Sequence, residues 1–104
     1  MKCIRLKQYG AADNLEYLDH TLPYMEQGQA VVDIRAVGVN FIDIYHRTGL
    51  YPLDLPITPG VEGAGIVSEI DNKYSHLKRG DRVAFVGVLG SYAEKIVVPC
   101  ARLV

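Results

Sequence analysis

Apolar and polar positions alternate along much of the chain, in short runs separated by Gly, Pro and Asp. Between residues 28 and 40, Ala30, Val32, Ile34 and Ala36 fall on one face of an extended chain, and two charged residues fall on the other. A period of two is the pattern of a half-buried β-strand. The sequence therefore predicts a strand across this segment.

Five other segments carry a strand signal, with the first two weaker than the rest. They span residues 1–7, 15–19, 63–71, 83–88 and 91–99. A polar stretch over residues 72–82 separates the third from the fourth, and Pro99 ends the last. Short strands divided by turn residues favour a β-barrel or a rolled sheet over alternating β and α units. The predicted fold class is mainly β.

Residues 40–49, NFIDIYHRTG, break the β pattern because their apolar and aromatic side chains recur at helical spacing. Asn40 is a favourable N-cap, and Asp43 stands where the acid of a capping box stands. Gly49 can supply a left-handed stop. One short helix is predicted here, and the three prolines of residues 51–59 predict an extended loop after it.

Composition and charge narrow the class of protein. A chain of 104 residues that is 49% hydrophobic is suited to one globular domain. Its formal charge of −1 provides no field that would attract nucleic acid or an anionic membrane. The apolar runs are too short to span a bilayer, and the start lacks the apolar core of a signal peptide. We expect a cytoplasmic protein.

The cysteines and histidines show no metal-ligand spacing. Cys3 and Cys100 lie near opposite ends of the chain, so two reduced, partly buried thiols are expected. His20, His46 and His76 are scattered, and we expect all three to be exposed to solvent. Neither a metal site nor a catalytic triad is predicted from these residues.

The glycine-rich stretch PGVEGAGIV, residues 59–67, could in principle cradle a phosphate, hold a metal or turn the chain. A dinucleotide-binding G-x-G-x-x-G follows a strand and opens a helix, whereas this stretch reads GxxGxG and runs into a strand pattern. We therefore predict a tight corner where the backbone approaches a neighbour closely. The acid of this stretch, Glu62, is left without an assigned role.

Four stretches, AVGVNFIDIYHRTGLY, PGVEGAGIVSEI, KRGDRVAF and GSYAEKIVVP, resemble in order and spacing the N-terminal catalytic domain of medium-chain dehydrogenase/reductases. Within that superfamily the chain is most similar to the zinc-independent quinone oxidoreductases of the zeta-crystallin type. The resemblance implies a GroES-like rolled β-barrel with one short helix over residues 1–104. It also implies reduction of quinones or related conjugated carbonyls by NADPH.

Members of this family continue into a Rossmann domain that holds most of the cofactor, and then return to complete the barrel domain. The 104 residues contain no such nucleotide-binding unit. We therefore expect the chain to be inactive by itself. We also expect unpaired strand edges near Ile96–Val104, and hence a homodimer.

The resemblance also bears on zinc. Zinc-dependent relatives carry Gly-His-Glu where this chain has Gly60, Val61 and Glu62, and a cysteine where it has Asn40. Valine has no donor atom, and a neutral amide is a poor substitute for thiolate or imidazole. No zinc site is predicted.

The resemblance implies that Asn40 and Tyr51 contact the cofactor, and that Asn40, Tyr45 and Arg47 form the catalytic group. Each residue also has a structural interpretation: Asn40 as a helix cap, Tyr51 as a loop aromatic over the core, and Arg47 as a surface cation. The alternative function is a non-catalytic GroES-like module that binds a protein partner.

Overall fold

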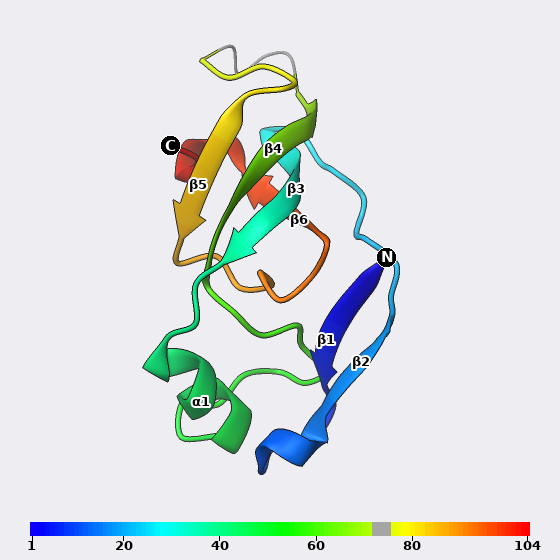
Figure 1. Ribbon diagram of the computed structural model, residues 1–104, viewed down its shortest axis with the longest axis vertical. Helices are drawn as coiled ribbons and strands as arrows, with labels where there is room; N and C mark the ends of the chain where they lie inside the picture. The colour runs from blue at the N-terminus through cyan, green and yellow to red at the C-terminus, as the bar shows by residue number, and fades with distance from the viewer. Residues whose placement is uncertain (72–75) are drawn as a thin grey trace.

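The computed structural model describes residues 1–71 and 76–104, so part of the polar stretch predicted over residues 72–82 lies outside the described residues (Figure 1). The strands are β1 (Lys2–Leu6), β2 (Leu15–Asp19), β3 (Gln29–Val37), β4 (Glu62–Ile70), β5 (Arg82–Val86) and β6 (Lys95–Pro99). Among the described residues one α-helix is present, α1, which spans Phe41–Thr48, and short 3-10 turns span Ala12–Asn14 and Cys100–Arg102. Every predicted strand and the predicted helix are present.

The strands form two antiparallel sheets. β1 pairs with β2, and a four-stranded sheet has the order β5-β4-β3-β6. Single bridges connect Cys3 to Ala93 and Leu6 to Ile57. Figure 1 shows α1 beyond the end of the four-stranded sheet, across from the β1-β2 pair. The mainly β fold with one short helix is confirmed, although the strands form two sheets rather than one closed ladder.

The core lies on one face of the four-stranded sheet. Its central residues are apolar side chains with at most 6% of their surface exposed: Ala30, Val32, Val67, Val83, Phe85, Ile96, Val98, Cys100 and Leu103. Both cysteine thiols are free and buried, as the sequence predicts.

The glycine-rich stretch lets two segments of backbone approach closely. A Cβ on Gly65 would lie 1.9 Å from the carbonyl oxygen of Asp33 on the neighbouring β3. Gly60 has a φ of 92°, and a Cβ there would lie 2.2 Å from Ser91 Oγ. Only glycine fits such contacts without displacing backbone or buried side chains. The predicted tight corner is confirmed.

The expectation of an unpaired strand edge near Ile96–Val104 holds for β6, which in the described residues is the outer strand of the four-stranded sheet and pairs with β3 alone. Ile96 and Leu103 are buried, and Val104 exchanges backbone hydrogen bonds of 3.0 and 3.1 Å with Ala84, at the outer edge of β5. The end of the chain therefore closes that edge. In the described chain, β6 pairs with the Gln29–Asp33 part of β3, so residues 35–37 of β3 extend beyond the end of this pairing.

Candidate functional site

Local sequence signals define both ends of α1. The carboxylate of Asp43 accepts the backbone N–H of Asn40 at 3.0 Å, as expected of a capping-box acid. At the other end, Gly49 has a φ of 87° and its N–H donates to the Tyr45 carbonyl. The predicted cap, capping-box acid and left-handed stop are all confirmed. Their effect is to fix Asn40 at the start of the helix.

Two apolar side chains of the helix, Phe41 and Ile44, face outward. Phe41 is 78% exposed and Ile44 is 41% exposed, whereas Asp43 and His46 are buried. The expectation that His46 is exposed is therefore wrong, because the inward face of this helix is polar; His20 and His76 are exposed. An outward apolar stripe is unusual for a helix that packs on a core, and it marks a surface suited to binding.

Tyr45 and Tyr51 form an aromatic pair at the end of this stripe. Their ring centroids lie 5.4 Å apart with the planes at 73°, an edge-to-face arrangement. The Tyr51 N–H also donates to the Tyr45 carbonyl at 3.3 Å. Tyr51 is 52% exposed, so half of its surface is free to contact a ligand. The structure brings these two predicted site residues together.

Tyr9 supports the loop that carries Tyr51. Its hydroxyl donates to the Leu53 carbonyl at 2.6 Å and accepts the Leu53 N–H at 2.8 Å. The Tyr9 ring also lies against Gly49, where a Cβ would meet it at 3.0 Å. Sequence reasoning missed this residue, because a contact across 44 residues leaves no local pattern.

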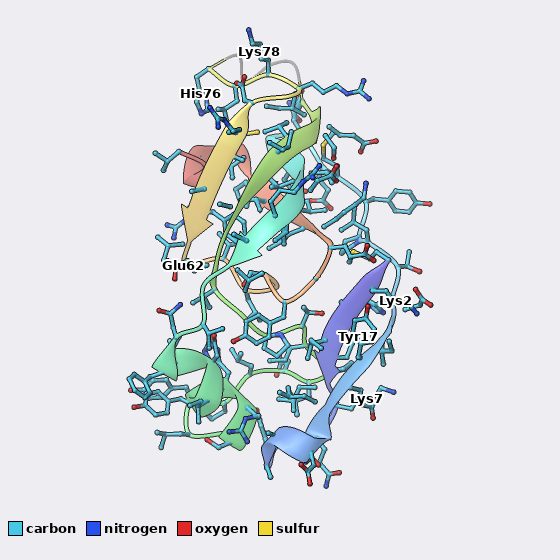
Figure 2. All side chains as sticks on the ribbon, in the orientation of Figure 1. Lys2, Lys7, Tyr17, Glu62, His76 and Lys78 are labelled. Atoms are coloured by element: carbon cyan, nitrogen blue, oxygen red, sulfur yellow. The ribbon has the colours of Figure 1, made fainter. Side chains whose placement is uncertain are left out.

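Asn40 lies against Glu62, the acid without an assigned role. The Asn40 amide Nδ2 donates to Glu62 Oε1 at 2.9 Å. Glu62 is the first residue of β4, and Figure 2 shows it at the end of the sheet that faces α1. Glu62 also lines a cavity of about 410 Å³, whose other lining residues include Gly38, Phe85 and Arg102.

A second carboxylate contact lies on the buried face of α1. The hydroxyl of Tyr92 donates to Asp43 Oδ2 at 2.5 Å. Burial, followed by this hydrogen bond and the negative charge of Asp43, raises the pKa of Tyr92 well above its usual value. No local pattern in the sequence points to Tyr92, because its partner is 49 residues away.

Arg47 contacts a different part of the chain. Its guanidinium donates to the Gly10 carbonyl at 2.7 Å, and the Gly10 N–H donates to the Arg47 carbonyl at 3.0 Å. These bonds tie the last turn of α1 to the segment after β1. The site residues predicted from the sequence thus separate into three groups: Asn40 with Glu62, Tyr45 with Tyr51, and Arg47 with Gly10.

Two further observations concern metals and membranes. Within residues 1–71 and 76–104, no group of three or more His, Cys, Asp or Glu side chains is arranged to hold a metal ion. No helix in the same residues has the length and apolar character needed to cross a bilayer. The absence of zinc predicted from Val61 and Asn40 stays a prediction.

Comparison with known proteins identifies the family. The alcohol dehydrogenase GroES-like domain matches residues 26–104. The chain belongs to this family. A quinone oxidoreductase of Pseudomonas aeruginosa is 42% identical over 105 residues, which cover 99% of this chain and 32% of that protein.

Solved structures agree with the sequence comparison. The quinone oxidoreductase of Pseudomonas syringae pv. tomato DC3000 superposes with a TM-score of 0.94 at 43% identity, over 99% of this chain and 32% of that one. The Escherichia coli quinone oxidoreductase complexed with NADPH superposes with a TM-score of 0.95 at 33% identity, over 100% of this chain and 32% of that one. The GroES-like domain thus spans about a third of the length of these relatives. The resemblance to quinone oxidoreductases of the medium-chain superfamily is confirmed.

Proposed function

We propose that this GroES-like domain is the catalytic-domain portion of a zinc-independent quinone oxidoreductase that uses NADPH. The observation that carries the proposal is the half-exposed Tyr51 ring, held edge-to-face against Tyr45 at the end of an outward apolar stripe. Support also comes from the E. coli relative, whose structure was solved with NADPH. A flat ring beside apolar side chains suits a nicotinamide or a quinone, which are themselves flat and mostly apolar.

The residues of this site fit the nicotinamide end of NADPH. Tyr51 offers a ring face and a hydroxyl, and Asn40 offers an amide with one carbonyl oxygen and one further N–H. When bound, NADPH supplies the hydride that the acceptor takes up. The role of the chain is then to bind the ring, to orient it and to exclude water with Phe41 and Ile44. Such orientation accounts for a large part of the rate of a two-substrate reaction.

We further propose that the acceptor oxygen is polarised by hydrogen-bond donors rather than by a metal. Val61 has no donor atom, and the Asn40 amide is already bonded to Glu62, so neither residue serves as a zinc ligand. Tyr45 and Tyr51 have the hydroxyl groups for this role. Arg47 stays a predicted catalytic residue, although its bond to Gly10 fits an anchoring role.

The 104 residues supply only part of the binding energy for NADPH. The pyrophosphate needs a helix N-terminus preceded by a glycine-rich turn, and the chain has no such motif. We propose that residues 1–104 alone do not turn over NADPH. A cytoplasmic location and a homodimer also stay predictions.

The test uses the protein as its gene encodes it and, where that product extends beyond the 104 residues, the isolated 104 residues beside it. NADPH binding is followed by fluorescence titration, and NADPH oxidation is followed with a simple benzoquinone as acceptor. We expect saturable binding and quinone-dependent oxidation in the full product only. A full product that binds no NADPH would contradict the proposal and favour the protein-interaction module.

A further inference from the structure

The hydrogen bond between Asn40 and Glu62 determines which way the Asn40 amide faces. An ionised carboxylate only accepts hydrogen bonds, so the NH₂ group of Asn40 must face Glu62, as the 2.9 Å contact from Nδ2 to Oε1 shows. The carbonyl oxygen of the amide is then directed away from Glu62. This oxygen faces the Asp43 N–H in the capping box but forms no side-chain cap hydrogen bond, because that N–H donates to the Asn40 backbone carbonyl at 3.0 Å. With two lone pairs, the side-chain oxygen can therefore accept a second bond from another donor. Since Asn40 is partly exposed, that second bond is available to a donor from outside the chain.

Both partners of this bond are themselves held in place. The Glu62 carbonyl accepts the Gly38 N–H at 3.1 Å, and the Glu62 carboxylate occupies the space next to Gly38, where a Cβ would lie 2.1 Å from Oε1. On the other side, Asp43 holds the backbone of Asn40, and Tyr92 holds Asp43. A pair restrained from both sides has little freedom to reorient, which is what a binding site needs.

We propose that Glu62 is a positioning residue, which keeps the Asn40 carbonyl oxygen turned outward to accept a hydrogen bond from the nicotinamide nucleoside half of NADPH. This inference rests on the proposed function. The donor on NADPH is either the NH₂ of the carboxamide or a hydroxyl of the adjoining ribose, since both are hydrogen-bond donors of that half. Glu62 acts through Asn40 and does not itself touch the cofactor.

The test exchanges donor and acceptor across the pair in the full gene product. Asn40→Asp places two carboxylates face to face, so the side chain at position 40 loses its partner and its orientation. Glu62→Gln lets the Asn40 amide bond in either orientation. In the double variant, the amide introduced at position 62 can donate to the carboxylate introduced at position 40, which restores the bond and leaves one acceptor oxygen facing outward.

The readout is the Kd of NADPH, measured by fluorescence titration. We expect Asn40→Asp to weaken binding by about tenfold, Glu62→Gln by about threefold, and the double variant to return to within about twofold of the wild type. Thermal unfolding of each variant confirms that it is folded. If Asn40→Asp fails to fold, Asn40→Leu takes its place in the comparison. Asn40→Leu must then bind NADPH more weakly than the double variant.

The outcomes separate this inference from the proposed function. Wild-type protein that binds NADPH, with a double variant no tighter than Asn40→Asp or Asn40→Leu, would overturn the role of Glu62 and leave the function standing. Wild-type protein that binds no NADPH would overturn both.

A second ligand identifies the donor. The reduced 3-acetylpyridine analogue of NADPH has a methyl group in place of the amide NH₂ and retains the ribose hydroxyls. If the carboxamide is the donor, we expect the wild type to bind the analogue more weakly than NADPH, and the preference to disappear in Asn40→Leu. If a ribose hydroxyl is the donor, the wild type should bind both ligands about equally, and Asn40→Leu should weaken both by the same factor.

Discussion

The hydroxyl of Tyr92 donates to Asp43 Oδ2, and the same oxygen accepts the backbone N–H of Asn40. One carboxylate oxygen therefore joins the segment before β6 to the first turn of α1. Because Asp43 is 5% exposed, water cannot easily replace either bond. The position of Asn40 thus depends, through Asp43, on Tyr92, which lies 49 residues after Asp43 in the sequence.

Replacing Tyr92 by Phe should lower the free energy of unfolding by about 1–2 kcal/mol near neutral pH, because the buried Asp43 carboxylate loses a donor. Chemical denaturation measures this change. Tyr17→Phe is the matched control, since Tyr17 is 72% exposed and lies on β2, away from Asp43. An equal loss of unfolding free energy in Tyr92→Phe and Tyr17→Phe would contradict a stabilising hydrogen bond between Tyr92 and Asp43.

The same pair predicts a dependence on alkaline pH. The folded state raises the pKa of Tyr92 above that of an unfolded tyrosine, which is about 10. Below the unfolded pKa both states keep the proton and stability is unaffected; above it the unfolded state loses the proton first, so stability falls as pH rises. The stability difference between wild type and Tyr92→Phe should be constant to about pH 9 and shrink by about pH 11. A constant difference throughout would refute the shifted pKa.

Gly65→Ala should be strongly destabilising, by about 3 kcal/mol or more, because the new methyl group would overlap the backbone carbonyl of Asp33. Gly80→Ala provides the comparison. Gly80 also has a positive φ, 92°, but no atom of residues 1–71 or 76–104 lies within 4 Å of its Cβ position, so only backbone strain of about 1 kcal/mol is expected. Thermal or urea unfolding of both variants measures the loss of unfolding free energy in each. A similar loss in Gly65→Ala and Gly80→Ala would contradict the role given to the close backbone contact at Gly65.

Tyr9→Phe should weaken NADPH binding by about threefold to tenfold in the full gene product. The ring still packs beside Gly49, but both hydrogen bonds to Leu53 are lost, so the loop that carries Tyr51 is less well held. The Kd of NADPH is measured beside Tyr17→Phe as control. Unchanged affinity would mean that the loop is positioned without Tyr9.

Zinc content gives a further check. Protein purified without chelators should contain far less than one zinc per chain by elemental analysis, since Val61 and Asn40 offer neither imidazole nor thiolate. Restoring a histidine by Val61→His, together with Asn40→Cys, should raise zinc binding above that of the wild type. Stoichiometric zinc in the wild type would contradict the proposal.

The fold could be predicted well from the sequence because its signals are local. Alternation located β3, the cap residues bounded α1, and the order of glycines in residues 59–67 excluded a phosphate loop. The boundaries were less accurate: the strand expected over 91–99 begins only at Lys95. Periodicity cannot report where a ladder of hydrogen bonds starts.

The candidate site could be predicted only in part. Asn40, Tyr45 and Tyr51 came from the resemblance, but Tyr9 and Tyr92 were missed because their partners lie more than 40 residues away in the chain. The burial of His46 was also missed, because the helix turns its polar side inward. A helical pattern gives the spacing of a stripe and not the direction in which it faces.

The proposed function places Tyr51 in the NADPH site, and the Kd of NADPH for Tyr51→Ala in the full gene product tests this placement. Tyr24→Ala is the matched control, since Tyr24 is 96% exposed and lies in the segment before β3. We predict that Tyr51→Ala weakens binding by about tenfold or more, as expected for a lost stacking surface, and that Tyr24→Ala leaves it unchanged. Equal affinity of Tyr51→Ala and the wild type would contradict the account.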